Sequence, residues 1–179
     1  MQSLELPPLK AQRAFNLRRW AELIEDTELA KFQGRIETDR FGHIVMSPPA
    51  AASHGSFQSE IGFLLRQLLA NGRVFTECPI STADGIKVAD VAWASRARVK
   101  ELGREICFSH APEICVEVIS PCNTDAEIEE KMALYFDSGA QEVWICAEGG
   151  AMTFYAATSN RAMRVSRICP RFPKHIELA

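Results

Sequence analysis

The sequence Glu-Ile-Cys-Val-Glu-Val-Ile, residues 113–119, decides the fold. Valine and isoleucine favour strands, and a strand with apolar residues on both faces is typical of the buried centre of a sheet. The stretch therefore predicts a central strand. Glu117 interrupts its pattern, because burying an unpaired charge among apolar neighbours costs several kcal/mol.

A helix and a second buried strand are predicted directly after this strand. Thr124 and Glu127, three residues apart, form the capping-box pattern of a helix start. Gly139 lies where a residue with left-handed backbone ends a helix, so the helix should span about residues 125–138. Residues 141–147 are again mostly apolar and predict a buried strand.

The segments before residue 113 predict a helix followed by two strands. Residues 54–70 carry apolar side chains at the spacing of an amphipathic helix, which Asn71-Gly72 closes. Residues 73–77 and 86–93 predict strands, and the charged segment 95–104 predicts a loop or a short helix. The order from residue 54 is therefore helix, three strands, helix, strand.

Both ends of the chain add further elements. Residues 10–30 have helical spacing of apolar side chains and predict one or two peripheral helices. Residues 35–38 and 43–47 flank a polar turn and predict a hairpin. Residues 153–157 and 164–168 predict two further strands.

Length and composition are those of an ordinary globular domain. The 179 residues predict one domain over 1–179, with a peripheral helical part at 1–33 and a core from about residue 34. The hydrophobic content of 47% and the charged content of 24% fit this class. No apolar run approaches the roughly 20 residues that span a bilayer, and Met1–Lys10 lacks the pattern of a secretory signal. We therefore expect a cytoplasmic protein without a membrane partner.

The cysteines and the net charge point to no particular site. No CxxC pair is present, so the cysteines are interpreted as reduced thiols rather than zinc ligands. The net charge of −3 gives no global attraction to nucleic acid, so DNA binding would need a local basic patch. The six cysteines are Cys78, Cys107, Cys115, Cys122, Cys146 and Cys169.

Three charged residues break the pattern of the elements that carry them. Glu117 and Asp90 both lie within apolar strands, and Lys131 shares the apolar helical stripe of Met132 and Tyr135. A structural role is possible for each. Either carboxylate could face water at an edge strand or pair with a buried arginine. The lysine could extend its amine along the core edge to solvent.

Together the three residues match the needs of metal-dependent phosphodiester hydrolysis. Asp90 and Glu117 supply hard oxygen ligands for Mg²⁺ or Mn²⁺, which neutralises charge on the phosphate. Lys131 can orient the attacking water or help to deprotonate it. Without a cation the two carboxylates should repel each other and hold their protons more tightly than isolated acids. We expect both to line one cleft, with the lysine amine close to them.

A set of short elements, in fixed order from Gly34 to the C-terminus, resembles a known family. The elements are Gly34-Arg-Ile-Glu37, His43-Ile-Val-Met-Ser-Pro48, His54 at a helix start, Ala89-Asp90-Val91, Ala111-Pro112-Glu-Ile-Cys-Val-Glu117-Val-Ile-Ser120-Pro121, Lys131 with Tyr135, and Gly139-Ala-Gln-Glu-Val-Trp144. The set is similar to the Uma-two family of proposed bacterial restriction endonucleases, which have the PD-(D/E)xK nuclease fold.

This resemblance implies an α/β fold with an αβββαβ core and a mixed central sheet. It implies Asp90 and Glu117 as metal ligands, with Lys131 in place of the motif lysine. That lysine usually stands two residues after the glutamate, where this chain has Ile119. Glu37 matches an acidic family position and is a further candidate for the metal site or for orienting water. Ala89 replaces the usual proline.

The leading hypothesis is a Mg²⁺-dependent endonuclease that acts on DNA as a homodimer. The rival is a catalytically silent nuclease fold that serves as a binding or regulatory module, which the acidic net charge favours. A third hypothesis is hydrolysis of another phosphodiester. His54 is more often a capping or packing residue than a base, and the basic run in residues 161–174 is more often a solvated face than a phosphate contact.

Overall fold

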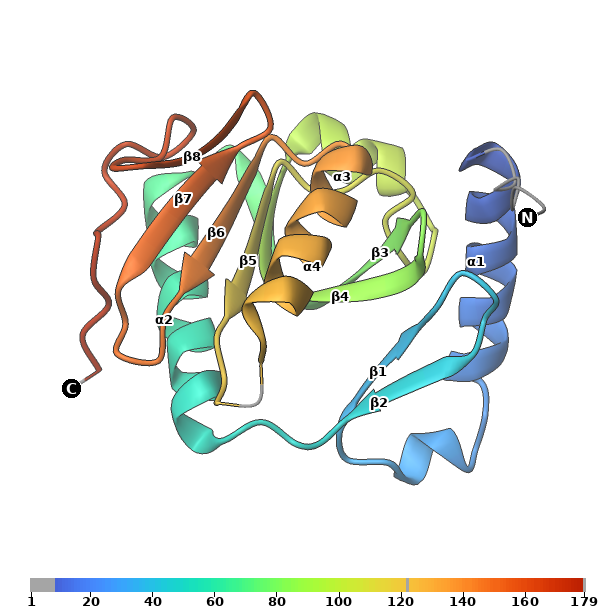
Figure 1. Cartoon of the computed structure of the whole chain (residues 1–179). Helices are drawn as coiled ribbons and strands as arrows, with labels where there is room; N and C mark the ends of the chain where they lie inside the picture. The colour runs from blue at the N-terminus through green and yellow to red at the C-terminus, as the bar shows by residue number, and fades with distance from the viewer. Residues whose placement is uncertain (1–8, 122, 179) are drawn as a thin grey trace, which may run out of the picture.

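A mixed sheet of six strands lies at the centre of the computed structural model, which describes residues 9–121 and 123–178 (Figure 1). The strands lie side by side in chain order, and only β5 and β6 run parallel. A parallel pair needs a crossover connection, which the helix between these two strands provides. The strands are β3 (Gly72–Thr82), β4 (Gly85–Ser95), β5 (Ile114–Val118), β6 (Glu142–Cys146), β7 (Met152–Ala156) and β8 (Ser159–Met163).

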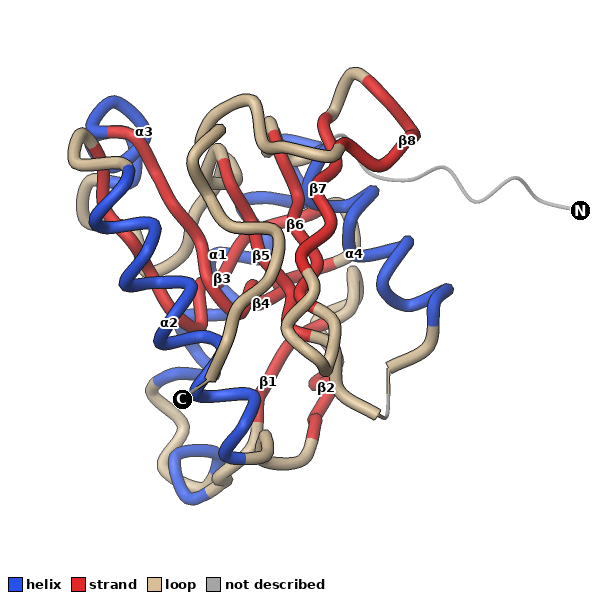
Figure 2. The backbone as a smooth tube through the Cα atoms, turned by 90° about the vertical axis from the view of Figure 1, so that its left-hand side faces the viewer, coloured by secondary structure: helices blue, strands red, loops and turns tan. Residues whose placement is uncertain are grey.

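Helices cover both faces of this sheet. The helix α2 (Ala52–Leu68) lies on one face and α4 (Asp125–Asp137) on the other, as Figure 2 shows. The short helix α3 (Arg96–Leu102) connects β4 to β5. The element order α2, β3, β4, β5, α4, β6 confirms the predicted αβββαβ core and the mixed sheet.

The strand β5 is buried on both faces, as predicted. Ile114, Val116 and Val118 belong to the apolar cluster beneath α2, whereas Cys115 belongs to the cluster beneath α4. Side chains two residues apart point to the same face of a strand. Glu117 therefore follows Cys115 and points toward α4.

The helix α4 begins and ends where the sequence predicts. The Thr124 hydroxyl and the Glu127 carboxylate accept the reciprocal backbone hydrogen bonds of a capping box. Gly139 has φ +104°, a conformation that only glycine adopts without strain. These two signals fix the length of α4 and therefore the position of Lys131 within it.

The N-terminal part forms a helix and a separate hairpin beside β4. The elements are α1 (Leu9–Ile24), a 3₁₀ turn η1 (Leu29–Lys31), and the strands β1 (Arg35–Thr38) and β2 (Ile44–Ser47), which pair antiparallel. Gly85, with φ +81°, allows the hairpin to approach, because a Cβ there would lie 2.4 Å from the carbonyl oxygens of Thr38 and Asp39. The close approach brings the side chains of β1 next to β4.

The predicted strand at residues 164–168 is wrong. The structure forms β8 at Ser159–Met163 instead, and residues 164–168 form no strand, although the Ser166 side chain among them is buried. The cause is the buried carboxylate of Glu142, which accepts hydrogen bonds from the Ser166 hydroxyl at 2.6 Å, the Arg167 amide at 2.6 Å and the Ile168 amide at 3.1 Å. Two of these donors are backbone amides that a sheet would otherwise use.

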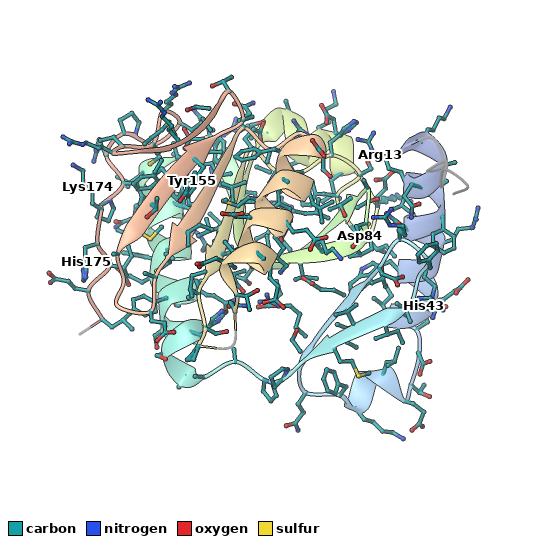
Figure 3. All side chains as sticks on the ribbon, viewed as in Figure 1. Arg13, His43, Asp84, Tyr155, Lys174 and His175 are labelled. Carbon is teal, nitrogen blue, oxygen red and sulfur yellow. The ribbon has the colours of Figure 1, made fainter. Side chains whose placement is uncertain are left out.

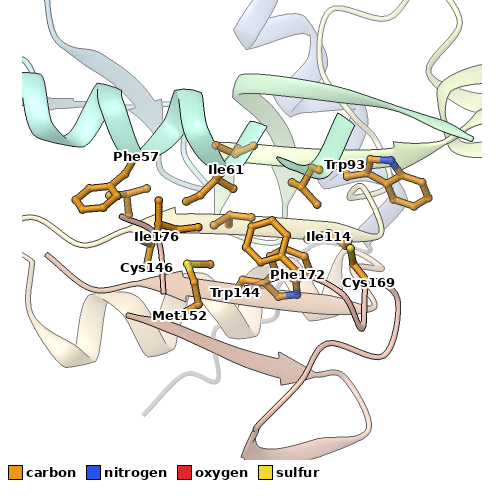
Figure 4. Packing of buried hydrophobic residues seen from close by; sticks show 14 of the residues in the cluster. Phe57, Ile61, Trp93, Ile114, Trp144, Cys146, Met152, Cys169, Phe172 and Ile176 are labelled. Atoms are coloured by element: carbon orange, nitrogen blue, oxygen red, sulfur yellow. The ribbon is translucent and has the colours of Figure 1, made fainter. Parts of the chain in front are cut away.

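This turn leads the C-terminal segment back over the face of the sheet that α2 covers. Phe172 and Ile176 pack there with Phe57 of α2 and Trp144 of β6, as Figure 4 shows. The ring centroids of Trp144 and Phe172 lie 4.6 Å apart. The C-terminal segment therefore completes the larger apolar core.

The cysteines of the described part of the chain are free thiols, and all of them are buried. They are Cys78, Cys107, Cys115, Cys146 and Cys169. The sixth cysteine, Cys122, and residues 1–8 lie outside the described residues. Over residues 9–121 and 123–178, no helix combines the length and apolarity needed to cross a membrane.

Replacing Glu142 should test how the C-terminal segment is held. Glu142→Ala leaves buried donors of Trp144, Ser166 and the backbone without an acceptor. We expect a loss of about 3 kcal/mol or more in the free energy of unfolding, measured by urea denaturation. The control Glu148→Ala removes an exposed carboxylate from the next turn and should change stability by less than about 0.5 kcal/mol. Equal effects of the two substitutions would contradict this interpretation.

Candidate active site

A cavity of about 780 Å³ opens between the hairpin, the start of α2 and one side of α4. All four candidate residues from the sequence line it, namely Glu37, Asp90, Glu117 and Lys131. They come from β1, β4, β5 and α4. The fold therefore brings distant parts of the chain together. Glu37 and Lys131 are 94 positions apart, and the Lys131 amine lies 2.8 Å from Glu37 Oε1.

Asp90 is buried and is held by donors on both carboxylate oxygens. Its Oδ1 pairs with Arg35 and accepts a hydrogen bond from Gln58 Nε2 at 3.1 Å. Its Oδ2 accepts the backbone amide of Val118 at 2.6 Å. Because Val118 follows Glu117 in the chain, this bond places the Asp90 carboxylate beside the peptide that carries Glu117.

The pKa of Asp90 is lowered to about 2. Burial alone would raise this pKa, but the hydrogen bond with His54 and the charge of Arg35 favour the carboxylate more strongly. The expectation that both carboxylates hold their protons tightly is therefore wrong for Asp90. The hydrogen bond with His54 contributes most to the lowering, and the positive charge beside Asp90 comes from Arg35.

Glu117 behaves as expected for a buried acid. Burial, together with the negative charge of Asp90, raises the pKa of Glu117 to about 7, although Lys131 opposes the shift. The Tyr135 hydroxyl donates to Glu117 Oε1 at 2.7 Å, and the Lys131 amine donates to Oε2 at 3.3 Å. Lys131 and Tyr135 are four residues apart on α4, so one face of that helix supplies both donors.

Lys131 points into the cavity rather than to solvent, with 18% of its side chain exposed. Its carboxylate partners are Glu37 and Glu117, and among the described residues it forms no ion pair with Asp90. Burial opposes the charge on the amine, but Glu117 and Glu37 together raise the pKa of Lys131 above its usual value. The lysine is therefore protonated at neutral pH and donates hydrogen bonds to both carboxylates.

Glu37 links the hairpin to the site. Its Oε1 lies 2.8 Å from the Lys131 amine and also accepts the backbone amide of Val88 at 2.8 Å. Val88 precedes Asp90 on the same strand, with one residue between them. Glu37 therefore fixes the lysine amine relative to the strand that carries Asp90.

Three residues near Asp90 are missing from the sequence-based prediction, namely Arg35, Gln58 and Glu77. Arg35 binds both oxygens of Glu77, at 3.0 and 2.9 Å, and Gln58 Nε2 donates to Glu77 at 2.7 Å. Arg35 stands two residues before Glu37 and so shares its face of β1, but this spacing does not identify Asp90 as its partner. Glu77 has φ +49°, the one positive φ of a non-glycine residue in the described part of the chain, and no sequence pattern reveals it.

His54 lines the cavity, contrary to the more frequent packing role. Its Nε2 donates to the Val118 carbonyl at 3.1 Å and lies 3.4 Å from Asp90 Oδ2. The hydrogen bond with Asp90 raises the pKa of His54. The histidine thus fixes Asp90 and the end of β5 relative to α2.

The basic run at residues 161–174 is remote from the hairpin. Figure 3 shows Lys174 and His175 at the opposite end of the molecule from His43 of the hairpin. The cavity itself is acidic, because it is lined by six carboxylates and by three lysine or arginine residues, namely Glu37, Glu77, Asp90, Glu117, Glu127 and Glu130, with Arg35, Lys87 and Lys131. A polyanionic substrate would therefore need additional positive charge in the cavity.

The donor atoms suit Mg²⁺ in chemistry, though they are few. Asp90 and Glu117 offer hard carboxylate oxygens next to an open cavity. In residues 9–121 and 123–178, no three His, Cys, Asp or Glu side chains are grouped so as to hold a metal ion. Mg²⁺ retains several waters and is usually held by one or two carboxylates. Two protein ligands with water therefore fit this ion.

The raised pKa of Glu117 gives a pH dependence of stability in the metal-free protein. The folded pKa lies above the unfolded value, so the stabilisation is complete below about pH 4.3 and is lost as the pH rises through about 7. Relative to Glu117→Gln, the wild type should lose on the order of 2 kcal/mol of unfolding free energy between pH 5 and pH 8.

Urea denaturation in the presence of a chelator measures this difference. Glu129→Gln, an exposed acid on the same helix, serves as the control and should run parallel to the wild type. A difference between wild type and Glu117→Gln that does not change with pH would contradict the raised pKa.

A family model described as "Putative restriction endonuclease" (Uma2) matches residues 22–169. The crystal structure of a protein from Anabaena variabilis, described as a "putative nuclease", is similar with a TM-score of 0.69 and 18% identity, over 89% of this chain and 93% of that one. At this identity the likeness shows a shared fold. No curated protein matches the sequence. Because the family model matches most of the chain, including every candidate residue, this protein belongs to the Uma2 family.

Proposed function

We propose that this protein is a Mg²⁺-dependent endonuclease that hydrolyses phosphodiester bonds in DNA. One observation carries the proposal: two buried carboxylates on neighbouring strands, Asp90 and Glu117, line one cavity with the protonated amine of Lys131. Family membership and the shared nuclease fold support hydrolysis of nucleic acid. The choice of Mg²⁺ as the metal ion and of DNA as the substrate goes beyond this support and is proposed here.

Asp90 and Glu117 would hold Mg²⁺ or Mn²⁺ in this mechanism. The ion, when bound, would neutralise negative charge that develops on the phosphate. Lys131 would orient the attacking water through a hydrogen bond from its ammonium group. Because its pKa is raised, this lysine does not accept the proton of the water. Glu37 acts as a positioning residue, since it holds the amine of Lys131 at 2.8 Å.

The rival function is a catalytically silent module, and one observation favours it. Asp90 is paired with Arg35 and Glu117 with Lys131, which is also how a purely structural ion-pair network is built. Hydrolysis of another phosphodiester is a third candidate. Catalysis by the purified protein separates the rival from the enzyme, and a panel of DNA, RNA and small diesters separates the substrates.

Substitution of the three residues tests the enzyme directly. Asp90→Asn and Glu117→Gln keep the shape of each side chain but remove a charge that a metal ligand must supply. Each should reduce Mg²⁺-dependent plasmid nicking by at least about a hundredfold and weaken Mn²⁺ binding. Lys131→Met should leave Mn²⁺ binding within a few-fold and still reduce the nicking rate.

The matched control is Glu129→Gln, an exposed acid on the helix of Lys131, which should nick at the rate of the wild type. Circular dichroism would check whether each variant is folded, which matters for Asp90→Asn because it leaves Arg35 without its buried partner. A wild-type protein that neither nicks DNA nor binds a divalent cation under any condition would refute the proposed function.

We also propose that the enzyme is a homodimer. Cleavage of both strands of a duplex is most simply achieved by two active sites, and this expectation rests on analogy at the level of the fold. Light scattering should give twice the mass of one chain, 19.9 kDa. A monomer at high concentration would contradict it.

A further inference from the structure

We propose that Arg35 is a built-in competitor of the metal ion: its guanidinium occupies the cation position at Asp90 in the metal-free protein and must leave that oxygen when a divalent cation binds. The proposal rests on the proposed function, since it assumes that Asp90 is a metal ligand. It makes Arg35 the residue that sets the affinity of the site for metal.

Both carboxylate oxygens of Asp90 already have partners in the metal-free protein. Oδ1 is shared by Arg35 and Gln58, and Oδ2 is bound by the Val118 amide and lies close to His54. The amide of Val118 is part of β5 and cannot move away without breaking the sheet. Arg35 is a cation at the end of a long side chain, so it is the partner that a metal ion can displace.

Arg35 and a metal ion would carry positive charge to the same carboxylate oxygen. Asp90 Oδ1 cannot bind a guanidinium and a divalent cation at the same point, and two such cations at contact distance repel strongly in a buried site. The cavity around them remains negative, because Glu77, Glu117 and other carboxylates line it. A metal ion can therefore bind favourably to these carboxylates only when Arg35 has left Asp90.

Glu77 is a second ion-pair partner that Arg35 can keep after it leaves Asp90. Arg35 is held by both oxygens of Glu77, whose side chain is 52% exposed, while that of Asp90 is 1% exposed. When Arg35 leaves Asp90 it can therefore stay bound to Glu77 at the rim of the same cavity. The left-handed backbone of Glu77 sets the position of this second partner.

The hairpin makes the same kind of contact twice. Arg35 and Glu37 lie two residues apart on β1, and they pair with Asp90 and with Lys131 respectively. One strand thus supplies a cation to a proposed metal ligand and an anion to the proposed water-orienting lysine. The charges of the metal-free site are balanced from the hairpin, which is the arrangement expected if Arg35 takes the place of the ion.

Metal binding to variants of Arg35 tests the proposal. Mn²⁺ affinity is measured by calorimetry, and by electron paramagnetic resonance of free Mn²⁺, at constant ionic strength. Arg35→Met should bind Mn²⁺ at least about tenfold more tightly than the wild type, since the population of competent sites is no longer limited by the arginine. Its melting temperature without metal should fall, and saturating Mn²⁺ should raise it by more than in the wild type.

Two further variants control for the geometry of the arginine and for the charge of the hairpin. Arg35→Lys keeps the charge but not the two-pronged contact with Glu77, so its Mn²⁺ affinity should lie between those of the wild type and Arg35→Met. It also preserves the test if Arg35→Met does not fold. Arg40→Met removes the ion pair of Arg40 with Asp84 at 3.1 Å, elsewhere on the hairpin, and should leave Mn²⁺ affinity unchanged.

The outcomes separate this inference from the proposed function. If the wild type binds Mn²⁺ and neither Arg35 variant binds it more tightly, the competitor role is wrong and the metal site stands. A rise in affinity in Arg40→Met equal to that in Arg35→Met would also overturn the inference, because the effect would then be one of general charge or hairpin loosening. If no variant binds Mn²⁺, both the inference and the proposed metal site fail.

Discussion

The neutralisation of two buried carboxylates is the constraint on which the rest of the structure depends. Asp90 and Glu117 lie in the two strands at the middle of the αβββαβ core, where an unpaired charge would be too costly to retain. Arg35 and Lys131 supply the opposite charges, one from the hairpin and one from α4. The positions of these two elements are therefore tied to the charges of the central sheet.

The two carboxylates differ because their partners differ. Arg35, His54 and a backbone amide keep Asp90 ionised, with its pKa lowered to about 2. Glu117 is buried against Tyr135, and burial raises its pKa to about 7. The metal-free site thus holds one permanent carboxylate and one that gains or loses a proton near neutral pH. Such a divergence of two acids is common in active sites, although structural networks also produce it.

Local patterns predicted the elements that local interactions form. The capping box at Thr124 and the left-handed residue Gly139 fix the ends of α4, and the apolar run around Glu117 identifies the central strand. The helical stripe that contains Lys131 indicated that its side chain faces the sheet. The structure agrees with each of these predictions.

The missed features all depend on contacts between distant residues. Nothing near Arg35 in the sequence indicates that it pairs with Asp90, and the left-handed backbone of Glu77 follows from tertiary contacts. Residues 164–168 do not form the expected strand, because two of their backbone amides donate to the buried carboxylate of Glu142. The strand pattern around Glu142 gives no sign of this contact. Long-range polar contacts of buried groups are the part of the fold that periodicity does not encode.

The most direct test of the central claim is the anomalous scattering of crystals grown or soaked with Mn²⁺. We predict an anomalous peak in contact with both Asp90 and Glu117, with the Arg35 guanidinium turned from Asp90 and still bound to Glu77. A site without a peak at saturating Mn²⁺, in which Arg35 remains on Asp90 and Lys131 on Glu117, would show that these charges form a structural network and would contradict the metal-dependent nuclease.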